Sequence, residues 1–329
     1  MSLLKPPPAP SPLVAHGAGA VAWPDPQREA AFQTWLAGVG TAYQLQGVSL
    51  RTASADASFR RYLRIDSRAG GSFIIMDAPP ERENSEPFVR VARLMLDAGL
   101  NVPHVLAWDE AGGFLLLTDL GAQTLIDVID RERPQANQDL YLQAVDTLLT
   151  WQRASRPGVL PPYDATLLRR ELALFPDWYL AQHRGVSVEG ALRETLDKTF
   201  SIIVARNLAA PSVYVHRDFM PRNLMAPTPP VKGAADPQLG VLDFQDAVYG
   251  PITYDIASLM RDAFLSWDEE FVLEVTIRYW ERARAAGLPV QTSIGAFSPA
   301  IEWMGLQRHL KVLGIFARLT LRDGKPQYL

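Results

Sequence analysis

The sequence predicts an α+β fold with two lobes, on three observations. The chain has 329 residues, more than a single compact domain usually holds. Between residues 43 and 118 apolar residues mostly follow the short, roughly alternating pattern of strands, and beyond Gly121 they follow helical spacing. We therefore expect a small N-terminal lobe with an antiparallel sheet, residues 28–120, and a larger, mostly helical C-terminal lobe, residues 121–329, with a cleft between them.

The first lobe is expected to follow a proline-rich, flexible tail, residues 1–27, whose short and interrupted apolar stretch is not typical of a signal peptide. An amphipathic helix is predicted from Gln27 to about Gly40. Two alternating runs around a polar turn at residues 52–58 predict a hairpin. The remaining expected elements of this lobe are strands at 72–76, 102–108 and 114–118 and a helix at 86–98.

The second lobe is expected to be mostly helical, with a short strand at residues 239–242. A Pro-, Gly- and Ala-rich surface loop is expected at residues 226–238. The predicted helical stretches are 125–131, 140–155, 167–183, 191–207, one that opens near Tyr254, and 301–321.

The composition excludes several classes of site. A formal net charge of -4 gives no electrostatic reason for binding nucleic acid. The absence of cysteine excludes disulfides, thiolate metal sites and cysteine nucleophiles, and fits a cytoplasmic location. The five histidines show no metal-ligand spacing, and no apolar run is long enough to span a membrane.

One stretch carries the pattern of a phosphotransferase active site. In His216-Arg217-Asp218-Phe219-Met220-Pro221-Arg222-Asn223, a polar loop presents Asp218 and, five residues later, Asn223, and the apolar run 239–242 then delivers Asp243. Phosphoryl transfer requires an oriented hydroxyl and a metal ion on the phosphate oxygens. We interpret Asp218 as the acceptor of the hydroxyl proton, and Asn223 and Asp243 as oxygen ligands of Mg²⁺. The tripeptide alone would more often be a solvated salt-bridge cluster.

These motifs resemble the aminoglycoside phosphotransferase and choline kinase-like family, small-molecule relatives of protein kinases. Within it, the chain is most similar to the bacterial kinases that phosphorylate N-acetylmuramate and N-acetylglucosamine at the anomeric hydroxyl in cell-wall recycling. The similarity runs from about residue 28 to the C-terminus, and its further marks are the segments 54–62, 76–80, 243–247 and 305–311. It implies a two-lobed protein-kinase-like fold, ATP and Mg²⁺ as cofactors, an amino-sugar substrate, and a 1-phosphate product passed to a nucleotidyltransferase.

The resemblance also implies where the nucleotide binds. The turn of the first hairpin would cover the phosphates through Ser54, Ser58, Phe59 and Arg60, although it lacks the glycines that commonly allow close backbone approach. A solvated turn is the plainer alternative. Backbone groups at residues 119–120, Asp119 and Leu120, would bind adenine.

The chain departs from the family pattern at Met76, where a phosphate-binding lysine is usual. Either Arg60 or Arg61 supplies the missing charge, or the nucleotide is held differently, or catalysis has been lost. This departure keeps open a non-catalytic, nucleotide-binding pseudokinase. An aminoglycoside phosphotransferase is the other alternative, and it would need an acidic substrate pocket.

The last predicted helix carries basic residues on one face. At about 100° per residue, Arg308, Lys311, Arg318 and Arg322 fall within an arc of about 80°. Either this face is solvated, or Arg308 and Lys311 meet an anionic group such as the lactyl carboxylate of muramate. Trp303 is a candidate to pack on the sugar ring.

Three further residues flank the catalytic pattern. Asp246 either touches substrate or metal or caps a turn. The resemblance implies that Asp255 braces the catalytic loop from below and that His216 gives it structural support.

Overall fold

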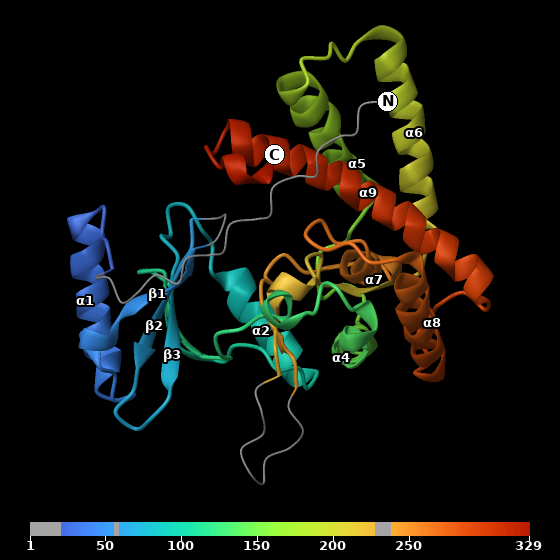
Figure 1. The fold of residues 1–329 in the computed structure, drawn as a ribbon. Coiled ribbons are helices and arrows are strands. Elements are labelled where there is room, and N and C mark those ends of the chain that lie inside the picture. The colour runs from blue at the N-terminus through green and yellow to red at the C-terminus, as the bar shows by residue number, and fades with distance from the viewer. Residues whose placement is uncertain (1–20, 56–58, 228–237) are drawn as a thin grey trace. The chain divides into compact units, whose positions relative to one another are not determined.

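The computed structural model describes residues 21–55, 59–227 and 238–329. The chain divides into two compact units, Met1–Ser85 with Val105–Asp119, and Glu86–His104 with Leu120–Leu329. The expected first lobe, residues 28–120, included the segment from Glu86 to His104, which here groups with the second unit. The architecture is α+β, as predicted, with an antiparallel sheet in the first unit and a mostly helical second unit (Figure 1).

The first unit is built on a five-stranded antiparallel sheet in the order β1-β2-β3-β5-β4. Its strands are β1 (Arg51–Ala55), β2 (Arg61–Asp66), β3 (Ser72–Asp77), β4 (Val105–Asp109) and β5 (Phe114–Thr118). The central strands are the most apolar, and Leu63, Ile75 and Leu116 are aligned across the sheet and buried. Strand alternation therefore gives the sheet one strongly apolar face.

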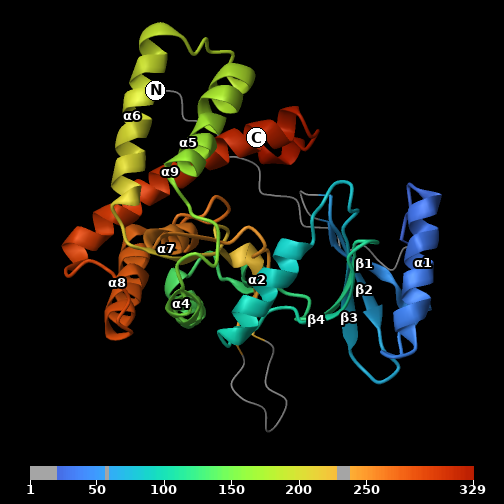
Figure 2. The same cartoon turned by 180° about the vertical axis from the view of Figure 1, so that it is seen from behind.

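Helix α1 (Pro26–Gly40) covers that apolar face, as both views show (Figures 1 and 2). Asp25 caps it by accepting a hydrogen bond from the N–H of Gln27, and Pro26 occupies its first turn. Phe32 is fully buried against Phe114, with ring centroids 5.6 Å apart. The expected tail lies outside the described residues up to position 20. Of the residues that follow, Val21 and Trp23 pack against the core of the first unit, and the ring centroids of Trp23 and Phe32 are 4.7 Å apart.

Two local predictions for the first hairpin were wrong. Residues 51–55 form β1 instead of the first part of a polar turn, because β1 is an edge strand whose exposed Thr52 and Ser54 need no apolar partner. The preceding run was expected to be a strand, but it contains a 3₁₀ turn, η1 (Gly47–Ser49).

The second unit is organised around α9 (Ile294–Leu321), which packs against α5, η3, α6, α7 and α8 (Figures 1 and 2). Three of these helices begin with a side-chain cap. Asp164, Asp268 and Ser293 accept hydrogen bonds from backbone N–H groups in the first turns of α5, α8 and α9, respectively. The other helices are α2 (Glu86–Asp97), α3 (Leu125–Val128), α4 (Gln138–Arg153), α5 (Ala165–Leu174), α6 (Gly190–Leu208), α7 (Thr253–Met260) and α8 (Glu269–Ala285), with short turns η2 (Pro134–Asn137), η4 (Pro221–Asn223) and η5 (Pro326–Tyr328).

Three helical predictions need correction. The stretch 167–183 is not one α-helix: α5 ends at Leu174 and continues as a π-helix, η3 (Phe175–His183), with Pro176 in its first turn. Helix α9 begins seven residues earlier than expected and tolerates Pro299 within its second turn. Helix α8 was not predicted, although it buries a helical stripe that includes Phe271, Val275 and Tyr279.

Two short ladders position the residues singled out by the sequence. Strand β6 (Ser212–Val215) pairs with β9 (Val248–Pro251), and β7 (Leu224–Met225) pairs with β8 (Gly240–Val241). The second ladder continues beyond its strands, since the N–H of Leu242 donates to the carbonyl oxygen of Asn223 at 2.9 Å. The chain after η4 and the chain after β8 therefore run side by side.

Candidate active site

The loop between β6 and η4 is fastened by His216, which is fully buried. Its Nε2 lies 2.9 Å from the carbonyl oxygen of Leu242, and its Nδ1 lies 3.2 Å from the N–H of Asp218. One nitrogen therefore donates and the other accepts, as in a neutral imidazole protonated at Nε2. Burial lowers the pKa of His216 despite the neighbouring Asp255 and Asp218, which agrees with that neutral form. The ring links the loop to the end of β8.

Asp255, in the first turn of α7, holds the backbone of the same loop from the other side. Its carboxylate is fully buried and accepts hydrogen bonds from the N–H groups of His216, at 2.7 Å, and Arg217, at 3.0 Å. Burial raises the pKa of Asp255 to about 6, and the nearby His216 and these hydrogen bonds act in the opposite direction.

Arg217 has a backbone conformation that is rare outside glycine, with φ of 79°. Its N–H is bound by Asp255, and its carbonyl oxygen accepts a hydrogen bond from Nη1 of Arg308 at 2.8 Å. Its guanidinium Nη2 lies 2.6 Å from Oε1 of Glu171. The residue directly before Asp218 is thus held at both ends of its backbone and at its side chain.

Asp218 is set apart by the lack of donors to its carboxylate: none of the residues in the described ranges hydrogen-bonds to it. Burial alone would raise the pKa of Asp218, but the positive charges of Lys311, Arg308 and Arg217 lower it below its ordinary value. The result is an ionised carboxylate that can accept a proton or a hydrogen bond from an acceptor hydroxyl.

Asn223 and Asp243 face one another across the β7–β8 ladder. The Nδ2 of Asn223 donates to the carbonyl oxygen of Asp218 at 2.8 Å and lies 3.5 Å from Oδ2 of Asp243. The amide oxygen of Asn223 and the carboxylate of Asp243 are hard oxygen donors of the kind that Mg²⁺ prefers. Asp243 has a positive φ of 60°, and its Oδ1 accepts a hydrogen bond from Gln245 at 2.9 Å.

The donor set fits Mg²⁺, which binds proteins through one or two carboxylates and completes its shell with water and phosphate oxygens. In support, Oε1 of Gln245 is buried without a hydrogen-bond partner among the described residues, directly beside Asp243. No group of three or more His, Cys, Asp or Glu suited to a metal occurs in the described ranges. An ion held by Asn223 and Asp243 would complete its shell with water or phosphate oxygens.

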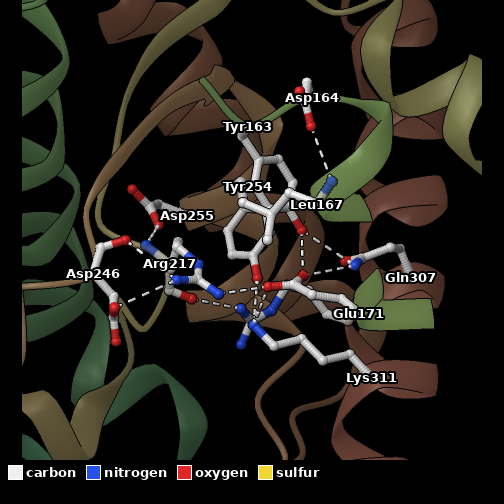
Figure 3. Close-up of polar contacts among 11 residues, drawn as sticks. Tyr163, Asp164, Leu167, Glu171, Arg217, Asp246, Tyr254, Asp255, Gln307 and Lys311 are labelled. Atoms are coloured by element: carbon white, nitrogen blue, oxygen red, sulfur yellow. Dashed lines mark hydrogen bonds and ion pairs between the residues drawn. The ribbon is translucent and has the colours of Figure 1, made fainter. Parts of the chain in front are cut away.

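A buried cluster around Glu171 of α5 lies next to this loop (Figure 3). One carboxylate oxygen, Oε2, accepts hydrogen bonds from the hydroxyl of Tyr163 and from Nε2 of Gln307, the latter at 3.1 Å. The other, Oε1, lies 2.6 Å from Nη2 of Arg217 and 3.1 Å from Nζ of Lys311. Burial raises the pKa of Glu171, but the two cations dominate and lower it to about 2.

The basic residues of α9 do not form one solvated face. Arg308 and Lys311 are buried, with 3% and 7% exposure, and Nζ of Lys311 donates to the hydroxyl of Tyr254 at 3.1 Å. By contrast, Arg322 is exposed and pairs with Asp323. The solvated-face alternative is therefore wrong for the first two residues.

Trp303 contacts α6 and is directed away from Arg308. Around the axis of α9 it lies about 140° from Arg308 and about 80° from Lys311. The Trp303 carbonyl accepts from Asn207 of α6, and its ring lies beneath Arg206 of the same helix. Asp246 is exposed, with Oδ1 3.8 Å from Nη1 of Arg217.

In the first unit, Met76 is fully buried on β3, and Asp77 follows on the opposite face of the sheet. The Asp77 carboxylate is bound by Arg28 of α1, at 2.6 Å, and by Arg61, at 2.5 Å. Arg61 pairs with Asp77 across the ladder, so strand alternation directs it away from the face of Met76. Arg61 is thus unsuited to replace a lysine at position 76.

The other residues expected at the nucleotide are placed as follows. Ser54 is exposed on β1, and Ser58 lies outside the described residues. The N–H of Phe59 donates to the carboxylate of Glu83 at 3.1 Å. Arg60 directly precedes β2. The side chain of Asp119 accepts hydrogen bonds from Arg64 and from Ser72, both at 2.6 Å, and Leu120 begins the second unit.

Sequence reasoning missed Glu171, Tyr163, Tyr254 and Gln307. A signal existed for Glu171, because it lies on the same helical face as the fully buried Leu168 and Leu172 of α5. An acid on an apolar stripe indicates a buried ion pair. Its partners could not be read from the sequence, since Arg217 follows 46 residues later.

Comparisons with known proteins agree with this arrangement. The model of the phosphotransferase enzyme family (APH) matches residues 49–288. A protein of Pseudomonas aeruginosa named N-acetylmuramate/N-acetylglucosamine kinase is 50% identical over 279 residues, covering 84% of this chain and 78% of the relative. One of the same name from Neisseria meningitidis serogroup B is 46% identical over 303 residues, covering 92% and 87%.

Solved structures of low sequence identity share the fold. The Plasmodium vivax ethanolamine kinase has a TM-score of 0.60 at 12% identity and covers 94% of this chain and 93% of its own. The GDP complex of aminoglycoside 2'-phosphotransferase-IIIa has a TM-score of 0.61 at 14% identity, covering 91% and 95%. The expected protein-kinase-like α+β fold is therefore confirmed.

None of the helices in the described ranges combines the length and apolar character that crossing a bilayer requires. The family match spans residues 49–288, which contain Asp218, Asn223 and Asp243, and the two relatives extend the similarity over most of the chain. The chain therefore belongs to the phosphotransferase enzyme family (APH).

Proposed function

We propose that the protein is an ATP-dependent kinase that phosphorylates the anomeric hydroxyl of N-acetylmuramate and N-acetylglucosamine. The names of relatives at 46% and 50% identity support this substrate class. The product would be a sugar 1-phosphate made in the cytoplasm during peptidoglycan recycling and consumed by a nucleotidyltransferase.

The observation that carries the proposal is the ionised Asp218 carboxylate, which receives no hydrogen bond from any described residue and stands beside the oxygen donors Asn223 and Asp243. In the reaction, Asp218 would orient the anomeric hydroxyl and accept its proton as the hydroxyl oxygen bonds to the γ-phosphorus, while the bond to the bridging oxygen breaks and ADP leaves. Asn223 and Asp243 would hold Mg²⁺, which would supply positive charge to the phosphate oxygens.

The buried cations of α9 act in this proposal on Asp218 and its loop. Lys311 and Arg308 keep the carboxylate ionised, and Arg308 holds the carbonyl of Arg217. Both already contact protein groups, so we do not assign them a direct bond to the lactyl carboxylate. The alternative acceptor is a polycationic aminoglycoside, which the substrate comparison below tests directly.

We also propose that the turn carrying Ser54, Ser58 and Phe59 covers the phosphates and that Asp119 and Leu120 contribute backbone groups to adenine binding. Arg60 is the candidate for the charge missing at Met76, because Arg61 is bound to Asp77 on the helix-covered face.

The proposal is tested by ADP release with Mg-ATP and, in parallel, N-acetylmuramate, N-acetylglucosamine, glucose, choline and kanamycin, with phosphorus NMR of any product. We expect turnover of the two amino sugars and an anomeric phosphate signal. Turnover of kanamycin or choline alone would overturn the sugar assignment. ATP binding without turnover of any acceptor would favour a pseudokinase.

A further inference from the structure

Arg217 is in a conformation that its side chain disfavours. Positive φ values cost an L-residue other than glycine about 1 kcal/mol or more and persist only where the surroundings enforce them. Its φ of 79° sets the direction in which the chain enters Asp218. The contacts that enforce this conformation therefore decide where the Asp218 carboxylate points.

Two contacts act on the backbone of Arg217, and its side chain is bound by Glu171 and, at the longer distance of 3.4 Å, by the carbonyl oxygen of the exposed Asp246. Asp255 accepts the N–H at 3.0 Å, and Arg308 donates to the carbonyl oxygen at 2.8 Å. Both bonds could form with any residue at position 217. Glu171 binds only the guanidinium, at 2.6 Å, so its contribution depends on arginine at that position.

Glu171 is suited to serve as a fixed anchor. It is buried on α5, with 4% exposure, and its Oε2 is held by Tyr163 and Gln307, both of them uncharged donors. The opposite oxygen, Oε1, is thereby directed at Arg217 and Lys311 (Figure 3). Because the carboxylate is bound on both oxygens, it can hold a neighbouring residue in a strained conformation.

We propose that Glu171 is a positioning residue for phosphoryl transfer: by binding the Arg217 side chain it keeps that residue at positive φ and so directs Asp218 at the acceptor hydroxyl. The inference rests on the proposed kinase function. It predicts that Glu171 affects turnover through the backbone of Arg217, while nucleotide binding is unaffected.

A matched pair of variants, Arg217→Ala and Arg217→Gly, separates the backbone from the ion pair. Both lose the contact with Glu171, but only glycine adopts positive φ without strain. We expect kcat of the alanine variant to be lower than that of the glycine variant by on the order of tenfold or more, with KM for ATP equal within about twofold. Equal kcat values for the two variants would overturn the proposal.

The second arm tests Glu171 itself. Glu171→Gln should lower kcat on the order of 10- to 100-fold in the unaltered protein, but by less than about threefold in the Arg217→Gly background. A similar loss in both backgrounds would mean that Glu171 acts through Lys311 or through folding, and would overturn the assignment.

A crystal structure of Glu171→Gln gives a readout that does not depend on turnover. Relaxation of Arg217 to negative φ, with displacement of Asp218, supports the inference, and an unchanged φ contradicts it. If the unaltered protein turns over no acceptor, the proposed function fails, whereas this structural result still decides the inference.

Discussion

Asp218 shows how single residues set the chemistry of this site. Burial alone would make its carboxylate a poor anion, yet its pKa lies below the ordinary value because Lys311, Arg308 and Arg217 surround it. Those cations would themselves be costly in a buried site without a counter-charge. Glu171 supplies this counter-charge, so the pKa of Asp218, a loop residue, depends on a carboxylate of helix α5.

The pKa of Glu171 leads to a pH-dependent stability difference. The folded protein lowers this pKa from 4.5 to about 2, so the carboxylate contributes stability above about pH 4.5 that is lost as the pH falls toward 2. Glutamine cannot titrate. We expect the stability gap between the unaltered protein and Glu171→Gln, measured by urea unfolding, to narrow by about 1 kcal/mol between about pH 6.5 and pH 3.5. A gap that widens on acidification would contradict the assigned ion pairs.

The proposed metal ligands give a second residue-scale prediction. Asp243→Asn removes a negative oxygen donor, so the Mg²⁺ concentration for half-maximal rate should rise about tenfold or more. The comparison variant is Asp246→Asn, three residues away and exposed. If only Asp243→Asn raises the Mg²⁺ requirement, Asp246 is not a metal ligand and its role is to cap the turn. A shift for Asp246 alone would contradict the proposed ligand set.

At the scale of elements, the packing of α9 against the end of α5 depends on Gly314. A Cβ at this position would lie 2.4 Å from the backbone carbonyl group of Leu174, where α5 passes into the π-helix η3. Backbone cannot move aside as a flexible side chain can. The close approach therefore requires glycine, although alanine is the better helix former.

Gly314→Ala should accordingly lower stability by about 1–3 kcal/mol, as overpacking does. Gly295→Ala is a matched control in the first turn of the same helix, where a Cβ would meet nothing within 4 Å. That change should be neutral or stabilising by up to about 1 kcal/mol. Thermal unfolding of both variants measures the difference, and equal stability would contradict the observed α5–α9 packing.

Elements with a strong apolar pattern were predictable, and the others were not, for physical reasons. The runs of β3 and β5 identify buried strands directly, whereas β1 is a polar edge strand and resembles a turn. The change from α5 to a π-helix leaves no periodic signal, because the apolar residues continue through it. Helix α8 did carry a helical stripe and a capping aspartate, Asp268, which the sequence reasoning overlooked.

At the scale of the whole molecule, the site has two parts: one is carried by residues close together in the sequence, and the other is assembled by long-range contacts. Asp218, Asn223 and Asp243 could be proposed from the sequence because one loop and one strand carry them within 26 residues. The cluster of Glu171, Arg217 and Lys311 could not, since three separate parts of the chain contribute to it. The burial of Lys311 could not be predicted from the sequence either, because a basic face of a helix is more often solvated.

The two compact units also divide the proposed roles. The first carries the candidate nucleotide groups and stabilises its sheet with the Arg28–Asp77–Arg61 cluster, and the second carries the proposed proton acceptor and metal ligands. A change at Asp218 should therefore affect chemistry in the second unit without altering the first.

The most direct test of the account is a rapid-quench measurement of phosphoryl transfer by Asp218→Asn, together with a titration of ATP binding. The amide nearly preserves the shape of the side chain but cannot accept the hydroxyl proton. We expect a loss of transfer rate of about 10²- to 10⁴-fold, with ATP affinity unchanged within about threefold. A transfer rate within about tenfold of the unaltered protein would contradict the assignment of Asp218 as the proton acceptor.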